Sequence, residues 1–166
     1  MKRGEQTDRT EDTSAYPGEG WLGTLASRVR ESEDKMTEVT VSVPARPDFI
    51  HVLRSVIAAI AARADFTYDS IDDMRLAVDE ASAQLLAFAA PATILTLRII
   101  LTEEGGLEVV ASTDADISTA VWPPEGAERT LTWQVLSALA DEARFERLDS
   151  GPALRLWKRR AEASRA

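Results

Sequence analysis

Short segments of alternating apolar and polar residues restrict the fold of this chain more than any other feature. Three valines alternate with polar residues over 38–43, the period of a strand that buries one face. Residues 93–101 and 107–112 flank a Glu-Glu-Gly-Gly turn, and residues 143–148 and 152–158 flank an Asp-Ser-Gly turn. Such spacing is typical of hairpins. The sequence therefore predicts five strands, joined mostly by hairpins.

Three helices are predicted between these strands. Residues 48–64, 70–89 and 131–143 repeat apolar side chains at intervals of three and four. The predicted N-caps are Asp48 for the first helix and Asp69 or Ser70 for the second. A sheet of hairpins needs one covered face, and three helices can cover it. We therefore expect a two-layer α/β sandwich: a mixed, mainly antiparallel five-stranded sheet with about three helices on one face.

Composition limits the classes of function. A length of 166 residues with 45% hydrophobic content suits one globular domain. Neither a membrane-spanning run nor a signal peptide is visible, so we expect a cytoplasmic protein. The absence of cysteine excludes thiol chemistry, and His51 is the only histidine. A net charge of −9 argues against direct binding of nucleic acid.

The chain divides into three parts by composition. Residues 1–36 are predicted to be a disordered or weakly helical tail, 37–158 the folded domain, and 159–166 a basic tail. Within the first part, four apolar residues would share one helical face, which fits either a frayed helix or a docking segment for a partner. These residues are Trp21, Leu22, Leu25 and Val29.

The helix predicted over 70–89 contains the stretch LAVDEASAQLLAFA, residues 76–89. One stripe of this helix is apolar and would dock on the sheet. Glu80 and Gln84 are four residues apart, so they lie one above the other on a different face, among small alanines. That face is either a solvated surface or the lining of a site.

The order strand, helix, and then a helix with LAVDEA resembles the serine-kinase anti-sigma factors of bacterial partner-switching systems. These belong to the ATPase superfamily that includes the histidine kinases. The resemblance covers residues 37–158, and TLTWQVLSALADEA is similar to the helix that follows the family's nucleotide lid. It implies a Bergerat-type ATPase fold and a homodimer.

The resemblance also implies roles for site residues. Glu80 matches the family's general base, which orients and deprotonates the attacking hydroxyl. Gln84 stands where the family has an asparagine that holds Mg²⁺ beside ATP. Asp114 or Asp116 would match the aspartate that binds adenine.

Three departures from the family pattern concern the nucleotide site. Glutamine at position 84 adds a methylene, which displaces its amide oxygen. The adenine-binding aspartate lacks its glycine-rich turn, since VVASTDADIST contains no glycine. Before the last helix only Gly126 is available to form a phosphate cradle. Together these changes predict weak ATP binding or none.

Three functions are compatible with these observations. The first is an anti-sigma factor that sequesters an alternative RNA polymerase sigma factor and is relieved by an anti-anti-sigma partner. By the resemblance, Arg54 and its exposed neighbours would contact the sigma factor, although a solvated Arg54 is equally compatible. The second is an active ATP-dependent serine kinase that phosphorylates the anti-anti-sigma partner. The third is an unrelated α/β interaction domain, in which the Trp-Pro-Pro loop is a surface connection.

Overall fold

The computed structural model describes residues 38–91, 93–117 and 121–161. The predicted apolar face formed by Trp21, Leu22, Leu25 and Val29 lies outside these residues. The strands are β1 (Glu38–Pro44), β2 (Ile94–Leu101), β3 (Gly106–Thr113), β4 (Glu142–Leu148) and β5 (Gly151–Arg159). The helices are α2 (Pro47–Arg63), α3 (Tyr68–Leu86), the 3-10 turn η1 (Ala127–Arg129) and α4 (Leu131–Leu139).

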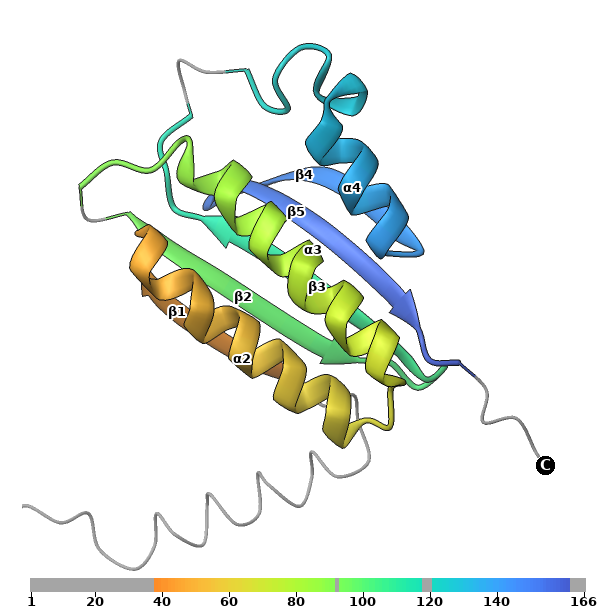
Figure 1. The fold of residues 1–166 in the computed structure, drawn as a ribbon. Coiled ribbons are helices and arrows are strands. Elements are labelled where there is room, and N and C mark those ends of the chain that lie inside the picture. The colour runs from red at the N-terminus through yellow and green to blue at the C-terminus, as the bar shows by residue number, and fades with distance from the viewer. Residues whose placement is uncertain (1–37, 92, 118–120, 162–166) are drawn as a thin grey trace, which may run out of the picture. The chain divides into compact units, whose positions relative to one another are not determined.

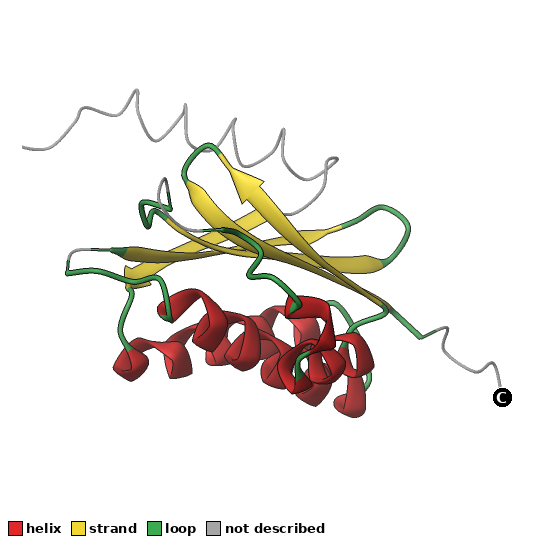
Figure 2. Cartoon of the chain, turned by 90° about the horizontal axis from the view of Figure 1, so that it is seen from above, coloured by secondary structure: helices red, strands yellow, loops and turns green. Residues whose placement is uncertain are grey.

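The five described strands form one sheet in the order β1-β2-β3-β5-β4 (Figure 1). All four pairings between them are antiparallel, so the sheet expected to be mainly antiparallel is antiparallel throughout. The helices lie together on one face of the sheet (Figure 2). The predicted two-layer α/β sandwich is therefore confirmed.

The core lies between the helices and the inward face of the sheet. The strands supply every second residue, and the helices supply the apolar stripes that their periodicity predicts. Fully buried side chains of this core include Leu53, Ile57, Met74, Val78, Leu85, Leu97, Ile99, Leu136, Leu154 and Leu156. In the described part of the chain, no helix combines the length and apolarity required to cross a bilayer.

Helix α2 begins one residue before the predicted cap. Pro47 occupies the first turn, where its missing N–H costs nothing and its fixed φ suits the helix. Arg46 is the N-cap residue and provides no side-chain cap. The prediction of Asp48 as N-cap is wrong, since Asp48 lies within the first turn and pairs with Arg46 at 2.6 Å.

The ends of α3 and α4 also differ from the prediction. Thr67 is the N-cap of α3, and its hydroxyl accepts a hydrogen bond from the backbone N–H of Ser70 at 3.3 Å. The predicted caps, Asp69 and Ser70, lie inside the helix. Helix α4 ends at Leu139, and Ala143 belongs to β4, where it pairs with β5. The helical spacing of apolar residues that predicted a helix over 131–143 therefore continues by coincidence into β4.

Both predicted hairpins are present. Gly105 has φ +77° in the β2–β3 turn, a conformation that suits glycine. Gly151 has φ +142°, and a Cβ there would collide with the carbonyl oxygen of Thr113. The glycine of the second turn thus allows β5 to begin against the end of β3.

Candidate functional site

Helix α3 has a buried stripe and two flanks with different partners. The buried residues of the stripe, Met74, Val78, Ala81 and Leu85, face the core. Glu80 and Gln84 lie on the flank toward α4, and both are half-buried. The side chains before and after them on this flank, Asp73 and Phe88, contact the elements around α4. This flank of α3, between Asp73 and Phe88, is therefore the one that lies toward α4.

At the Asp73 end of this flank lies Lys158 of β5. Its ammonium donates to the Oδ2 of Asp73 at 3.0 Å and to the carbonyl oxygen of Leu139 at 2.8 Å. Only 13% of the Lys158 side chain is exposed. Although it stands beside the predicted basic tail, Lys158 is therefore held inside the fold. This lysine links α3, the C-terminus of α4 and the sheet.

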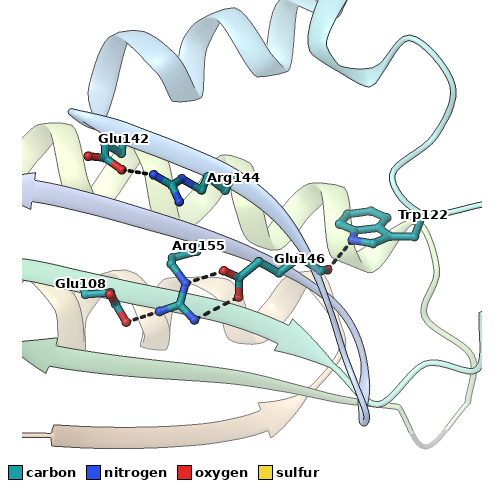
Figure 3. A network of polar contacts seen from close by, with 6 residues as sticks. All are labelled: Glu108, Trp122, Glu142, Arg144, Glu146 and Arg155. Atoms are coloured by element: carbon teal, nitrogen blue, oxygen red, sulfur yellow. Dashed lines mark hydrogen bonds and ion pairs between the residues drawn. The ribbon is translucent and has the colours of Figure 1, made fainter.

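At the Phe88 end of this flank lies an aromatic cluster, which consists of Phe88, Trp122, Trp133 and Phe145. The Trp122 ring stands edge-on to Phe88 at 5.1 Å and to Phe145 at 5.3 Å, while Trp133 stacks on Phe145 at 4.5 Å. Trp122 Nε1 donates to the Glu146 carbonyl oxygen at 2.6 Å (Figure 3). Trp122 is 7% exposed, so its own side chain packs into the core, whereas Val121 and Pro123 on either side of it are exposed.

These contacts show that α4 runs antiparallel to α3 along the flank that carries Glu80 and Gln84. The start of α4 lies near the end of α3, and Leu139 lies near Asp73. Neither Glu80 nor Gln84 makes a side-chain hydrogen bond or ion pair to any other described residue. No group of three or more acidic or histidine residues within the described ranges is arranged to hold a metal.

The Asp114 side chain is bonded to the first residue of strand β2. Its Oδ1 accepts a hydrogen bond from the backbone N–H of Ile94 at 2.6 Å, and its own N–H donates to the Ile94 carbonyl oxygen at 3.3 Å. The carboxylate thus extends the β2–β3 ladder by one step. Asp116 is exposed two residues further on and also has an interaction partner.

The segment before α4 uses its own backbone donors. The N–H groups of Ala127, Arg129 and Thr130 donate to carbonyl oxygens within residues 124–127. The Thr130 hydroxyl caps α4 by accepting from Trp133 N–H at 3.2 Å. A phosphate cradle needs such N–H groups to point at the ligand. In this structure these three N–H groups are instead bonded to carbonyl oxygens of their own segment.

Arg54 lies on α2 and reaches across to α3. Its Nη1 donates to the Oδ2 of Asp79 at 2.8 Å, and 41% of its side chain is exposed. Arg54 thus remains accessible while holding an internal carboxylate. Periodicity within one helix could not predict this pair, because the two residues are 25 positions apart on separate helices.

The face of the sheet opposite the helices carries a charged network (Figure 3). Arg155 of β5 binds Glu146 of β4 through two hydrogen bonds, at 2.6 and 3.0 Å, and also pairs with Glu108 of β3. The hydrogen bond from Arg155 lowers the pKa of Glu146 below its ordinary value, although burial opposes the shift. The same bond raises the pKa of Arg155.

Two members of this network, Arg155 and Glu108, line a hollow of about 370 Å³ together with Glu104, Glu142, Arg144, Trp157 and Arg159. Strand alternation could have placed Glu146 and Arg155 on one face. Their contact also depends on the register of β4 against β5, which sequence reasoning did not assign. Two further hollows lie along residues 123–129 and around Ser70 and Lys158. None of these three hollows is lined by Glu80 or Gln84.

These elements define an α/β sandwich domain whose long helix carries Glu80 and Gln84 on the flank toward α4. Comparison with known proteins then places it among particular relatives. The chain is 34% identical over 104 residues to the anti-sigma-F factor RsbW of Mycobacterium tuberculosis, a match that covers 63% of this chain and 58% of that protein. It is 26% identical over 80 residues to the serine-protein kinase RsbW of Bacillus cereus, which covers 48% and 50%.

A solved structure shares the fold. The crystal structure of the RsbU and RsbW domains of a Mycobacterium tuberculosis protein aligns with a TM-score of 0.60 at 14% identity, over 78% of this chain and 34% of that one. No protein-family model matches the sequence. The chain spans between half and three fifths of the two RsbW relatives described above. These matches confirm the expected resemblance of the chain to RsbW proteins.

Proposed function

We propose that this chain is an anti-sigma factor, which sequesters an alternative RNA polymerase sigma factor and releases it when an anti-anti-sigma partner binds. The observation that carries the proposal is that Asp73 and Phe88, at the two ends of the α3 flank with Glu80 and Gln84, are already engaged by other residues of this chain. The similarity to an anti-sigma-F factor supports the same function. Sequestration requires a stable surface and no catalysis.

Weak or absent ATP binding accords with the chemistry of the site. The N–H groups before α4 are bonded within their own segment, and the Asp114 carboxylate holds the end of β2. Gln84 carries its amide oxygen further from the helix than the asparagine of the family would. A nucleotide would have to displace several of these contacts at once.

A serine kinase that phosphorylates the anti-anti-sigma partner is the second candidate. One observation favours it: the half-buried Glu80 carboxylate makes no ion pair with any described residue, so it remains available as a base. Gln84 would then hold Mg²⁺, and Asp114 or Asp116 would bind adenine. The similarity to a serine-protein kinase points in the same direction.

The partner surfaces follow from the same proposal. The exposed part of Arg54 on α2 would contact an acidic group of the sigma factor. We further propose that the chain acts in the cytoplasm as a homodimer, and that residues 37–158 carry the function. The segments 1–36 and 159–166 would be accessory tails.

Two parallel experiments test the proposal. Mass spectrometry of proteins that co-purify with the full chain from its native cells should identify a sigma factor. Purified chain with γ-labelled ATP, Mg²⁺ and the co-purifying antagonist should transfer no phosphate. Transfer that disappears in Glu80→Ala, but persists in the control Glu103→Ala at the exposed β2–β3 turn, would establish the kinase instead. Recovery of no sigma factor would contradict the regulatory proposal.

A further inference from the structure

The seam between α2 and α3 contains an ion pair whose two members differ in accessibility. Arg54 on α2 donates through Nη1 to the Oδ2 of Asp79 on α3 at 2.8 Å. The Arg54 side chain is 41% exposed, whereas that of Asp79 is 28% exposed. The guanidinium is thus within reach of another protein, and its present partner lies deeper in the seam.

Asp79 depends on Arg54 for compensation of its charge. Its other oxygen, Oδ1, is buried and has no hydrogen-bond partner among the described residues, and the same is true of Ser82 Oγ one turn further along α3. Burying a carboxylate oxygen without a partner is unfavourable. A protein that drew Arg54 away would leave Asp79 with both oxygens uncompensated.

We propose that Asp79 is an internal competitor for Arg54 and thereby sets how tightly the chain holds an acidic partner. The inference rests on the proposed function, in which Arg54 contacts the sigma factor. A carboxylate of the partner would have to replace or share the bond to Asp79, since strong binding of a carboxylate uses two parallel N–H groups of the guanidinium. Asp79 therefore weakens the complex and acts only through Arg54.

The proposal predicts an increase in affinity when Asp79 is removed. Partly exposed ion pairs contribute little, so the expected effect is about 1.5- to 5-fold tighter binding in Asp79→Ala. Asp79→Asn should give a smaller increase, because its amide oxygen can still accept from Arg54. Asp72→Ala is the matched control: it breaks the Asp72–Arg75 pair on the same helix and should leave the affinity unchanged.

A double variant separates this mechanism from a general charge effect. The probe is the sigma factor that co-purifies with the wild-type chain, expressed alone and titrated by calorimetry. Arg54→Ala should bind it more weakly, and Arg54→Ala with Asp79→Ala should bind it as weakly as Arg54→Ala alone. If Asp79 instead repelled the partner directly, its removal would raise affinity in both backgrounds.

The outcomes distinguish failure of this inference from failure of the proposed function. A wild-type chain that binds no sigma factor defeats both. A wild-type chain that binds, with unchanged or weakened binding in both folded Asp79 variants, defeats the competitor role alone. Circular dichroism of each variant establishes that it is folded before titration.

Discussion

Trp122 shows how a single side chain can fix a connection that has little regular structure. It lies between Phe88 at the end of α3 and Phe145 on β4, and its indole N–H reaches the Glu146 carbonyl oxygen. Large aromatic side chains dominate local packing energy. The side chain of Trp122 is therefore held between the end of α3 and β4 by these contacts.

Replacing Trp122 tests this role. Trp122→Ala should lower the free energy of unfolding by about 3–5 kcal/mol, since it opens a cavity among aromatic neighbours. Trp122→Phe keeps part of the packing but loses the hydrogen bond, so its loss should be smaller. Urea denaturation measures both. Val121→Ala, at a neighbouring residue that is 74% exposed, is the control and should change stability little.

The ionisation of Glu146 makes the free energy of unfolding depend on pH. Its folded pKa lies below the ordinary value because Arg155 binds the ionised form. The ion pair should therefore stabilise the fold above about pH 4.3, the ordinary glutamate pKa, and this contribution should disappear as the pH falls through the folded pKa. Denaturation of wild type and Glu146→Gln from pH 7 to pH 3 should show a difference that shrinks with acid. A constant difference would contradict the assignment.

At the scale of elements, α3 is connected to three neighbours: the sheet, α2 and α4. Its stripe packs on the sheet, one flank meets α2 through Asp79, and the other is joined to α4 by Lys158, which binds both Asp73 and the Leu139 carbonyl oxygen. Helix α4 has only nine residues and one fully buried side chain, Leu136. A helix this short depends on tertiary contacts for its stability.

The link through Lys158 should therefore control the order of α4. Lys158→Met keeps the length of the stem but removes the donors to Asp73 and Leu139, which should cost about 1–3 kcal/mol. Hydrogen exchange of residues 131–139 should accelerate more than that of α2. Arg144→Met, which breaks an exposed pair with Glu142, is the control. Equal exchange of α4 in wild type and Lys158→Met would show that the link is dispensable.

The sequence predicted most elements because their periodicity is local. Valine alternation identified β1, and glycine turns identified both hairpins. Errors arose where two local signals competed: Pro47 at the first turn of α2 displaced Asp48 as the cap, and Ala143 continued a helical spacing into β4. Boundaries depend on such local competition, whereas the existence of an element depends on its whole pattern.

The candidate site was predictable only in part. Glu80 and Gln84 share a face because they are four residues apart on one helix. The contacts at the two ends of this face join residues far apart in sequence, 85 positions for Asp73 and Lys158 and 24 for Trp122 and Glu146. No pattern within a single segment can predict contacts between residues so far apart in sequence, so only the structure shows them.

At the scale of the whole molecule, the helices cover one face of the described sheet, and the two ends of the α3 flank with Glu80 are engaged by Lys158 and Trp122. A chain built this way should hold its partner through its surface, and nucleotide should make little difference. The kinase alternative requires the opposite, because its site would need Mg²⁺ and ATP to assemble.

The most direct measurement is a titration of the co-purifying sigma factor onto nucleotide-free chain, repeated with saturating Mg²⁺ and ATP. Our account predicts dissociation constants that agree within about twofold in the two conditions. Binding that appears only with ATP, or tightens by about tenfold or more, would contradict it.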